Sequence, residues 1–166
     1  MLSNEFDELM QRGFRYALSL THDRPAAEDL LQDACLRVSR RGGPWHAGYL
    51  LKAIRNGWID GLRRGKIKTE AIDAVAEDEL IEPAVDFVPP EELLGGLLGR
   101  VSARDRELLY LSAVEGYTAA EIGGLTGRPR GTILSALFRA KQKLRRLAQA
   151  DLAGGGAVAD GEGGVG

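Results

Sequence analysis

Cysteine and histidine are scarce in this chain of 166 residues, which contains one cysteine and two histidines. Cys35 cannot form an internal disulfide, and its place on an apolar helical stripe indicates a buried structural thiol. His22 and His46 stand alone, without the neighbours that metal sites or catalytic sets require. The sequence therefore does not point to an enzyme, and we expect no cofactor and no metal.

Long apolar runs are also missing. No stretch reaches the ~18 consecutive apolar residues that a membrane span needs. The N-terminal sequence MLSNEFDELM is acidic and amphipathic, and it lacks the basic region and apolar core of a signal peptide. We therefore expect a cytoplasmic protein with no membrane insertion.

Basic residues are absent from residues 69–99, a segment with a charge of −9. Residues 1–68 carry +4, residues 100–149 carry +6 and the remaining tail carries −3, which gives the net charge of −2. Two basic blocks separated by an acidic segment indicate two modules that each meet a polyanion.

Apolar residues repeat at spacings of three and four, which predicts an all-α fold of two small helical domains. We expect helices that start after Ser3 or Asn4, at the Asp23 cap and near Ala47, the last of these ending near Arg64. Ser102 and Asp105 are expected to form a capping box for a helix that runs through Leu108, Leu111 and Val114 and ends at Gly116. The predicted organisation is a first domain (1–68), an acidic linker (69–90), a second domain (91–149) and a disordered glycine-rich tail (150–166).

The stretch Tyr117–Leu147 has the pattern of a helix-turn-helix. Thr118 and Glu121 form a capping box, and Gly127 marks the break between the helices. The second helix has an apolar stripe at Ile133, Leu137, Ala140, Leu144 and Leu147. Its other face carries Arg130, Thr132, Ser135, Arg139, Lys143 and Arg146. These donors suit a DNA major groove, but an ordinary helical hairpin with a solvated basic face fits the same pattern.

The predicted third helix gathers hydrogen-bond donors that could hold single-stranded nucleic acid: Lys52, Arg55, Asn56, Arg63 and Arg64. Trp45 and Tyr49 could stack on bases or could be partial core residues. On the second helix, Glu28, Asp29, Gln32, Asp33 and Arg37 form a polar face that could be merely solvated.

Taken together, the segments AAEDLLQDACLRV (26–38), YLLKAIRNGWIDGLRR (49–64) and ARDRELLYLSAVEGYTAAEIGGLTGRPRGTILSALFRAKQKLRRL (103–147) resemble the extracytoplasmic-function (ECF) sigma factors of bacterial RNA polymerase. The resemblance covers about residues 6–147. It implies promoter-specific transcription initiation with core RNA polymerase and promoter DNA as partners. An anti-sigma factor is a further partner that such proteins often have.

The resemblance also implies roles for individual residues. Asp29, Gln32 and Asp33 would contact a coiled coil of the polymerase clamp. The third helix and the loop before it would recognise and melt the minus-ten element, through Trp45, Lys52, Arg55, Asn56, Arg63 and Arg64. The second helix of the helix-turn-helix would read the minus-thirty-five element, through Arg130, Thr132, Ser135, Arg139 and Lys143. The acidic linker would thread polymerase channels, or serve only as a solvated tether.

The sequence departs from the family pattern at Ala136, where an arginine is usual, and we expect the change to remove a DNA contact. Trp45 and Tyr49 also stand where phenylalanine and tryptophan are common. Two alternatives remain. A sigma-like decoy would bind a regulator without promoter recognition and would lose its basic DNA-facing residues. A conventional helix-turn-helix regulator would use its first domain to dimerise or bind a ligand.

Overall fold

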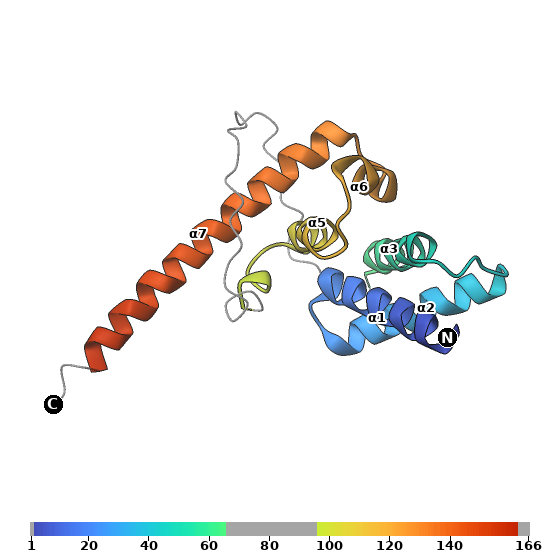
Figure 1. Cartoon of the computed structure of the whole chain (residues 1–166), viewed down its shortest axis with the longest axis horizontal. Helices are drawn as coiled ribbons and strands as arrows, with labels where there is room; N and C mark the ends of the chain where they lie inside the picture. Colours follow the sequence, from blue (N-terminus) through green and yellow to red (C-terminus); the bar gives the residue numbers. More distant parts are fainter. Residues whose placement is uncertain (1, 66–95, 163–166) are drawn as a thin grey trace.

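The computed structural model describes residues 2–65 and 96–162, and Figure 1 shows their helices in two groups. The first group contains α1 (Leu2–Thr21), α2 (Arg24–Arg40) and α3 (Ala47–Arg63). The second contains α5 (Ala103–Ala113), α6 (Ala119–Thr126) and α7 (Arg130–Glu162). The all-α prediction with a C-terminal helix-turn-helix is confirmed. The predicted linker 69–90 lies outside the described residues.

Two caps define the first helical group. Asp23 accepts a hydrogen bond at Oδ2 from the amide of Ala26 over 3.1 Å, so the predicted cap of α2 is confirmed. His46 caps α3 in the same way, because its Nδ1 accepts from the amide of Tyr49. The predicted start of α1 is too late, since the helix already includes Ser3 and Asn4. Water can satisfy the first amides of an exposed helix, so no side-chain cap is required there.

The core of the first group is formed by one face of each helix. Cys35 lies at its margin and is half-buried rather than buried, with Sγ 3.5 Å from Sδ of Met10. Burial raises the pKa of this thiol, which disfavours the reactive thiolate. The fully buried aliphatic residues of these three helices are Ala17, Leu20, Ala27, Ala34, Val38, Leu50, Leu51 and Ile54.

The helix α5 begins as predicted and ends earlier. Ser102 accepts at Oγ from the amide of Asp105 over 3.1 Å. The helix ends at Ala113, so the predicted end at Gly116 is too late, and the side chain of Val114 is 60% exposed. Gly116 follows with φ of +70°, a left-handed conformation that favours glycine.

The helix α7 is 33 residues long and extends away from the other helices (Figure 1). Its predicted stripe is buried at Ile133, Leu137, Ala140 and Leu144, whereas Leu147 is half-buried. The helix continues to Glu162, which differs from the disordered tail expected from residue 150. Glycine lowers helix propensity, but an existing helix propagates without a new nucleation cost. Residues 163–166 lie outside the described residues.

The two helical groups pack against each other through α1 and α5. Tyr16 of α1 is fully buried in one apolar cluster with Leu108 and Leu111 of α5. Tyr16 is not among the residues whose spacing predicts the buried apolar face of α1, which are Phe6, Leu9, Met10, Gly13, Phe14, Ala17 and Leu18. The structure thus joins two domains that the sequence presents as separate modules.

Candidate nucleic-acid interfaces

A groove of about 610 Å³ lies between α2 and α3 and is lined by four cations, Arg37, Arg41, Lys52 and Arg63. Tyr49 supplies an aromatic ring in the same groove and Asn56 a side-chain amide. Asp60 is the acidic residue of the lining, and its Oδ2 lies 3.6 Å from Nη1 of Arg37. Proteins usually hold single-stranded nucleic acid in this way: cations lie along the phosphates, and an aromatic ring stacks on the bases.

The six residues predicted to contact the minus-ten element do not all lie in this groove. Lys52, Asn56 and Arg63 line the groove together. Arg64 is the exposed C-cap residue of α3. Arg55 projects away from the groove to Glu107 of α5, with Nε 3.0 Å from Oε2.

Trp45 lies apart from the groove. Its ring packs edge-on against Phe6 of α1, with centroids 5.7 Å apart, in a second hollow that His46 and Arg12 also line. Phe6 is 45% exposed, which differs from the core position expected for it. Trp45 is 42% exposed, so part of its surface remains accessible to a partner.

Two groove residues, Arg37 and Arg41, are missing from the nucleic-acid contacts that the sequence predicts. The sequence pattern places Arg37 on the polar face of the second helix, and Arg41 in the break that follows it. Their position in the chain could have assigned them to the groove. A short loop joins the second helix to the third, so the C-terminal end of the second helix must lie beside the third helix.

The helix-turn-helix is built as its sequence predicts. Thr118 and Glu121 exchange the two hydrogen bonds of a capping box at the start of α6. Gly127 ends α6 in the left-handed conformation, with φ of +75°. Gly123 allows the turn to approach α6, since a Cβ atom there would lie 2.6 Å from the carbonyl oxygen of Arg128. The turn thereby fixes α7 against α6.

The residues predicted to read the minus-thirty-five element differ in exposure along α7. Arg130 and Thr132, in the first turn, are exposed, whereas Ser135, Arg139 and Lys143 are half-buried. Leu134 lies among them with 40% of its surface exposed, and sequence reasoning misses it because leucine suggests a core position. An exposed apolar side chain on a recognition helix can contact the methyl group of thymine.

Ala136 stands where the family pattern has an arginine, and its side chain is buried in the apolar core with Ile133 and Leu137. It lies three residues after Ile133 and therefore on the same side of the helix. The expected loss of a DNA contact at this position stays a prediction.

The polar face of α2 is exposed at Asp29, Gln32 and Asp33, which are spaced to form one surface. Leu36 continues this surface with 54% of its area exposed, although the sequence pattern does not mark it as part of the polar face.

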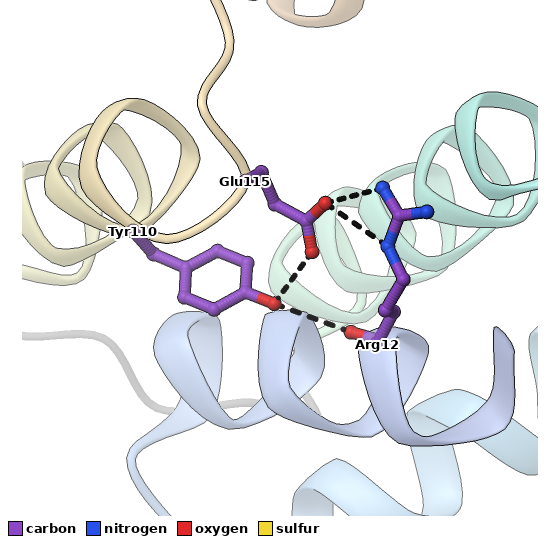
Figure 2. Close-up of polar contacts among 3 residues, drawn as sticks. All are labelled: Arg12, Tyr110 and Glu115. Carbon is purple, nitrogen blue, oxygen red and sulfur yellow. Dashed lines mark hydrogen bonds and ion pairs between the residues drawn. The ribbon is translucent and has the colours of Figure 1, made fainter. Parts of the chain in front are cut away.

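Buried polar contacts connect the two domains. Glu107 accepts at Oε2 from the hydroxyl of Tyr16 over 2.6 Å as well as from Arg55. In a second cluster, Glu115 accepts from Arg12 and from the hydroxyl of Tyr110, as Figure 2 shows. Burial and the neighbouring carboxylate raise the pKa of both tyrosines, which therefore remain hydrogen-bond donors.

Family comparisons match both domains. The model of sigma-70 region 2 matches residues 5–67, and the model of sigma-70 region 4 matches residues 91–144. The ECF RNA polymerase sigma factor SigM of Bacillus subtilis is 29% identical over 146 residues, which cover 81% of this chain and 86% of SigM. ShbA of Streptomyces griseus, also an ECF RNA polymerase sigma factor, is 32% identical over 142 residues, covering 76% of this chain and 73% of ShbA.

A solved structure has the same fold. The sigma factor RpoE, crystallised with the anti-sigma factor NepR from Bartonella quintana, aligns with a TM-score of 0.66 and 24% identity. The alignment covers 90% of this chain and 98% of RpoE.

The two matched regions define a sigma-70-type protein with a helical region 2 and a helix-turn-helix region 4. The chain belongs to the ECF RNA polymerase sigma factors, as the resemblance predicted. It directs promoter-specific transcription initiation as a partner of core RNA polymerase and promoter DNA. Among the described residues, no helix is both long and apolar enough to cross a membrane.

Proposed function

We propose that the groove between α2 and α3 holds the melted strand of the minus-ten element. Arg41, Lys52 and Arg63 neutralise phosphates, Tyr49 stacks on a base, and Asn56 donates to a base edge. The observation that supports this assignment is the concentration of four cations around one aromatic ring in a groove of about 610 Å³. Extruding a base costs a few kcal/mol, which these contacts would offset.

The start of α7 is proposed to enter the major groove of the minus-thirty-five element. Arg130 and Thr132 reach base edges, while Ser135, Arg139 and Lys143 contact the backbone or bases further along the helix. The graded exposure of these side chains supports the orientation, because the first turn of a recognition helix lies deepest in the groove.

The surface formed by Asp29, Gln32, Asp33 and Leu36 is proposed to bind core RNA polymerase. This surface lies on α2 and includes none of the four cations that line the groove. The protein therefore offers one surface to the polymerase and a different one to the melted strand, as a promoter-specificity subunit requires.

These assignments describe a binding subunit rather than an enzyme, acting in the cytoplasm where the polymerase is found. The sigma-like decoy predicts a loss of basic residues, whereas the groove retains Arg37, Arg41, Lys52 and Arg63. A conventional regulator leaves the match to region 2 unexplained. RpoE was crystallised with an anti-sigma factor, and an anti-sigma partner is proposed for this chain as well.

Two substitutions test the division of roles. Asp33→Ala removes a carboxylate from the α2 surface and should weaken binding to core polymerase, with Asp7→Ala, another exposed acid, as its control. Arg139→Ala should weaken promoter binding by the assembled holoenzyme and leave polymerase binding unchanged. Equal polymerase binding by Asp33→Ala and Asp7→Ala would contradict the α2 assignment. Equal promoter binding by Arg139→Ala and the wild type would contradict the docking of α7.

A further inference from the structure

One acidic side chain lies among the cations of the groove between α2 and α3, and it has no part in the DNA contacts proposed above. Asp60 of α3 lines this groove together with Arg37, Arg41, Lys52 and Arg63. A carboxylate in this position repels phosphates and so weakens general binding of nucleic acid. Its presence is explained only by a contact that the cations alone do not provide.

The partner of Asp60 is Arg37, which reaches it from the neighbouring helix α2. Nη1 of Arg37 lies 3.6 Å from Oδ2 of Asp60. The two side chains are 39% and 43% exposed, and an ion pair with that much exposure adds little to stability. Stability of the fold therefore does not account for the pair.

Gly57 allows the side chain of Arg37 to lie across α3. A Cβ atom on Gly57 would lie 3.5 Å from Nη1 and 3.9 Å from Cζ of Arg37, so the guanidinium lies directly over this glycine. Asp60 follows three residues later and is therefore on the same side of the helix. The glycine and the carboxylate together hold the guanidinium in one orientation on the surface of α3.

The guanidinium is held beside the residue that is proposed to contact a base. Asn56 lies one helical turn before Asp60, and both line the groove with Arg37. A base edge that meets Asn56 therefore lies on the same side of α3 as the guanidinium of Arg37.

The charge of Asp60 makes a base a better acceptor for Arg37 than a phosphate. A phosphate at the guanidinium would bring two anions close together, whereas a base edge is neutral. Arginine has five N–H donors in a planar fork, and one carboxylate cannot accept all of them. The fork matches the O6 and N7 acceptors of guanine, whereas adenine has an amino group in place of one of them.

We propose that Arg37, held in position by Asp60, reads one guanine of the melted minus-ten strand by donating hydrogen bonds to its O6 and N7 atoms. The proposal rests on the assignment of the groove to this strand. It makes Arg37 a determinant of base preference and Asp60 its positioning residue, while Arg41, Lys52 and Arg63 provide general affinity.

The test uses the holoenzyme assembled from the full chain and core RNA polymerase. The probe is a promoter identified by mapping the transcripts of this holoenzyme, with an unpaired minus-ten region in which each base of the melted strand is replaced in turn. In the wild type, one position should favour guanine over each other base by about tenfold, as expected for a bidentate contact.

Arg37→Ala should abolish this preference without changing the slope of log affinity against log salt, because Arg37 neutralises no phosphate. Arg37→Lys keeps the charge but lacks the fork, so it should not restore the preference. Unchanged binding of core polymerase shows that each variant is folded.

Asp60→Ala separates positioning from charge. The variant should bind the probes without guanine more tightly than the wild type does, because the groove has lost an anion, and it should lose the guanine preference. The double variant of Arg37→Ala with Asp60→Ala should show the same preference as Arg37→Ala alone, since both residues act through one contact. Asp7→Ala, which removes an exposed acid of α1, should match the wild type.

Three results would overturn the proposal. One is a wild type with no position that prefers guanine, including a wild type that prefers cytosine through its amino group at Asp60. Another is a guanine preference that survives in Arg37→Ala. The third is an Asp60→Ala variant that binds every probe more tightly by the same factor and keeps the preference. Binding that is insensitive to Lys52→Ala and Arg63→Ala would instead contradict the groove assignment itself, so the two failures are distinguishable.

Discussion

Arg106 of α5 donates from Nε to the backbone carbonyl of Ser19 near the end of α1, over 2.9 Å. The same guanidinium donates to the carbonyls of Leu20, Leu98 and Val101. The last carbonyls of a helix have no partner within the helix and carry its negative dipole end. Arg106 of the second domain thus caps the C-terminal end of α1 in the first domain.

Arg106→Ala should lower the free energy of unfolding by about 3 kcal/mol, because several buried carbonyls lose a charged donor. Urea unfolding measures the change. Arg100→Ala is the matched control, since Arg100 pairs at the surface with Asp151, at 2.7 Å, and its removal should cost less than about 1 kcal/mol. Similar losses of stability for the two variants would show that the hydrogen bonds of Arg106 contribute little.

Two neighbouring glycines of α6 should respond oppositely to alanine. Gly123→Ala places a Cβ atom 2.6 Å from the carbonyl oxygen of Arg128, and the resulting overpacking should cost about 1–3 kcal/mol. In Gly124→Ala the new Cβ atom points into open space, so the substitution should stabilise the helix by up to about 1 kcal/mol. Thermal melting of the two variants should therefore show shifts of opposite sign. A stabilising Gly123→Ala would contradict the close packing of the turn.

The groove between α2 and α3 should leave a salt signature in DNA binding. Lys52→Ala or Arg63→Ala in the holoenzyme should reduce the slope of log affinity against log salt by about 0.7 for each single-strand phosphate that the protein no longer neutralises. Binding to a promoter with a pre-melted minus-ten region, measured over a salt series, gives the slope. Arg24→Ala is the control, because Arg24 lies at the other end of α2 from the groove. An unchanged slope for both groove variants would exclude phosphate binding by Lys52 and Arg63.

Leu134 should contribute to base preference rather than to general affinity. Leu134→Ala should weaken discrimination at one thymine of the minus-thirty-five element by about 1 kcal/mol while leaving the salt slope unchanged. Binding to a set of single-base variants of the element measures this. Leu152→Ala, an exposed leucine further along the same helix, should have no effect on any base. A uniform reduction across all bases would mean that Leu134 acts through folding of the helix.

Local features of the fold follow well from the sequence. The caps at Asp23 and Thr118 and the glycine break at Gly127 depend on neighbouring residues, so their pattern is visible in one short segment. The contact of Tyr16 with Glu107 joins residues 91 positions apart, and no local pattern contains it. For the same reason, the sequence places Arg55 with the DNA contacts and does not predict its hydrogen bond to Glu107.

The candidate site can be predicted in part. Lys52, Asn56 and Arg63 share one face of a helix, so their spacing brings them together. Arg37 and Arg41 join them from another element, which only the packing of α2 on α3 determines. The burial of Ala136 likewise depends on how α7 is rotated against α6 and α5, which the family pattern alone does not reveal.

Reconstituted transcription tests the central claim most directly. The full chain would be mixed with core RNA polymerase and genomic DNA, and the 5′ ends of the transcripts mapped. The account predicts new start sites that share minus-ten and minus-thirty-five sequences and that disappear when the chain is omitted. A chain that binds no core polymerase, or one that binds it and yields no start sites beyond those of core polymerase alone, would contradict the account.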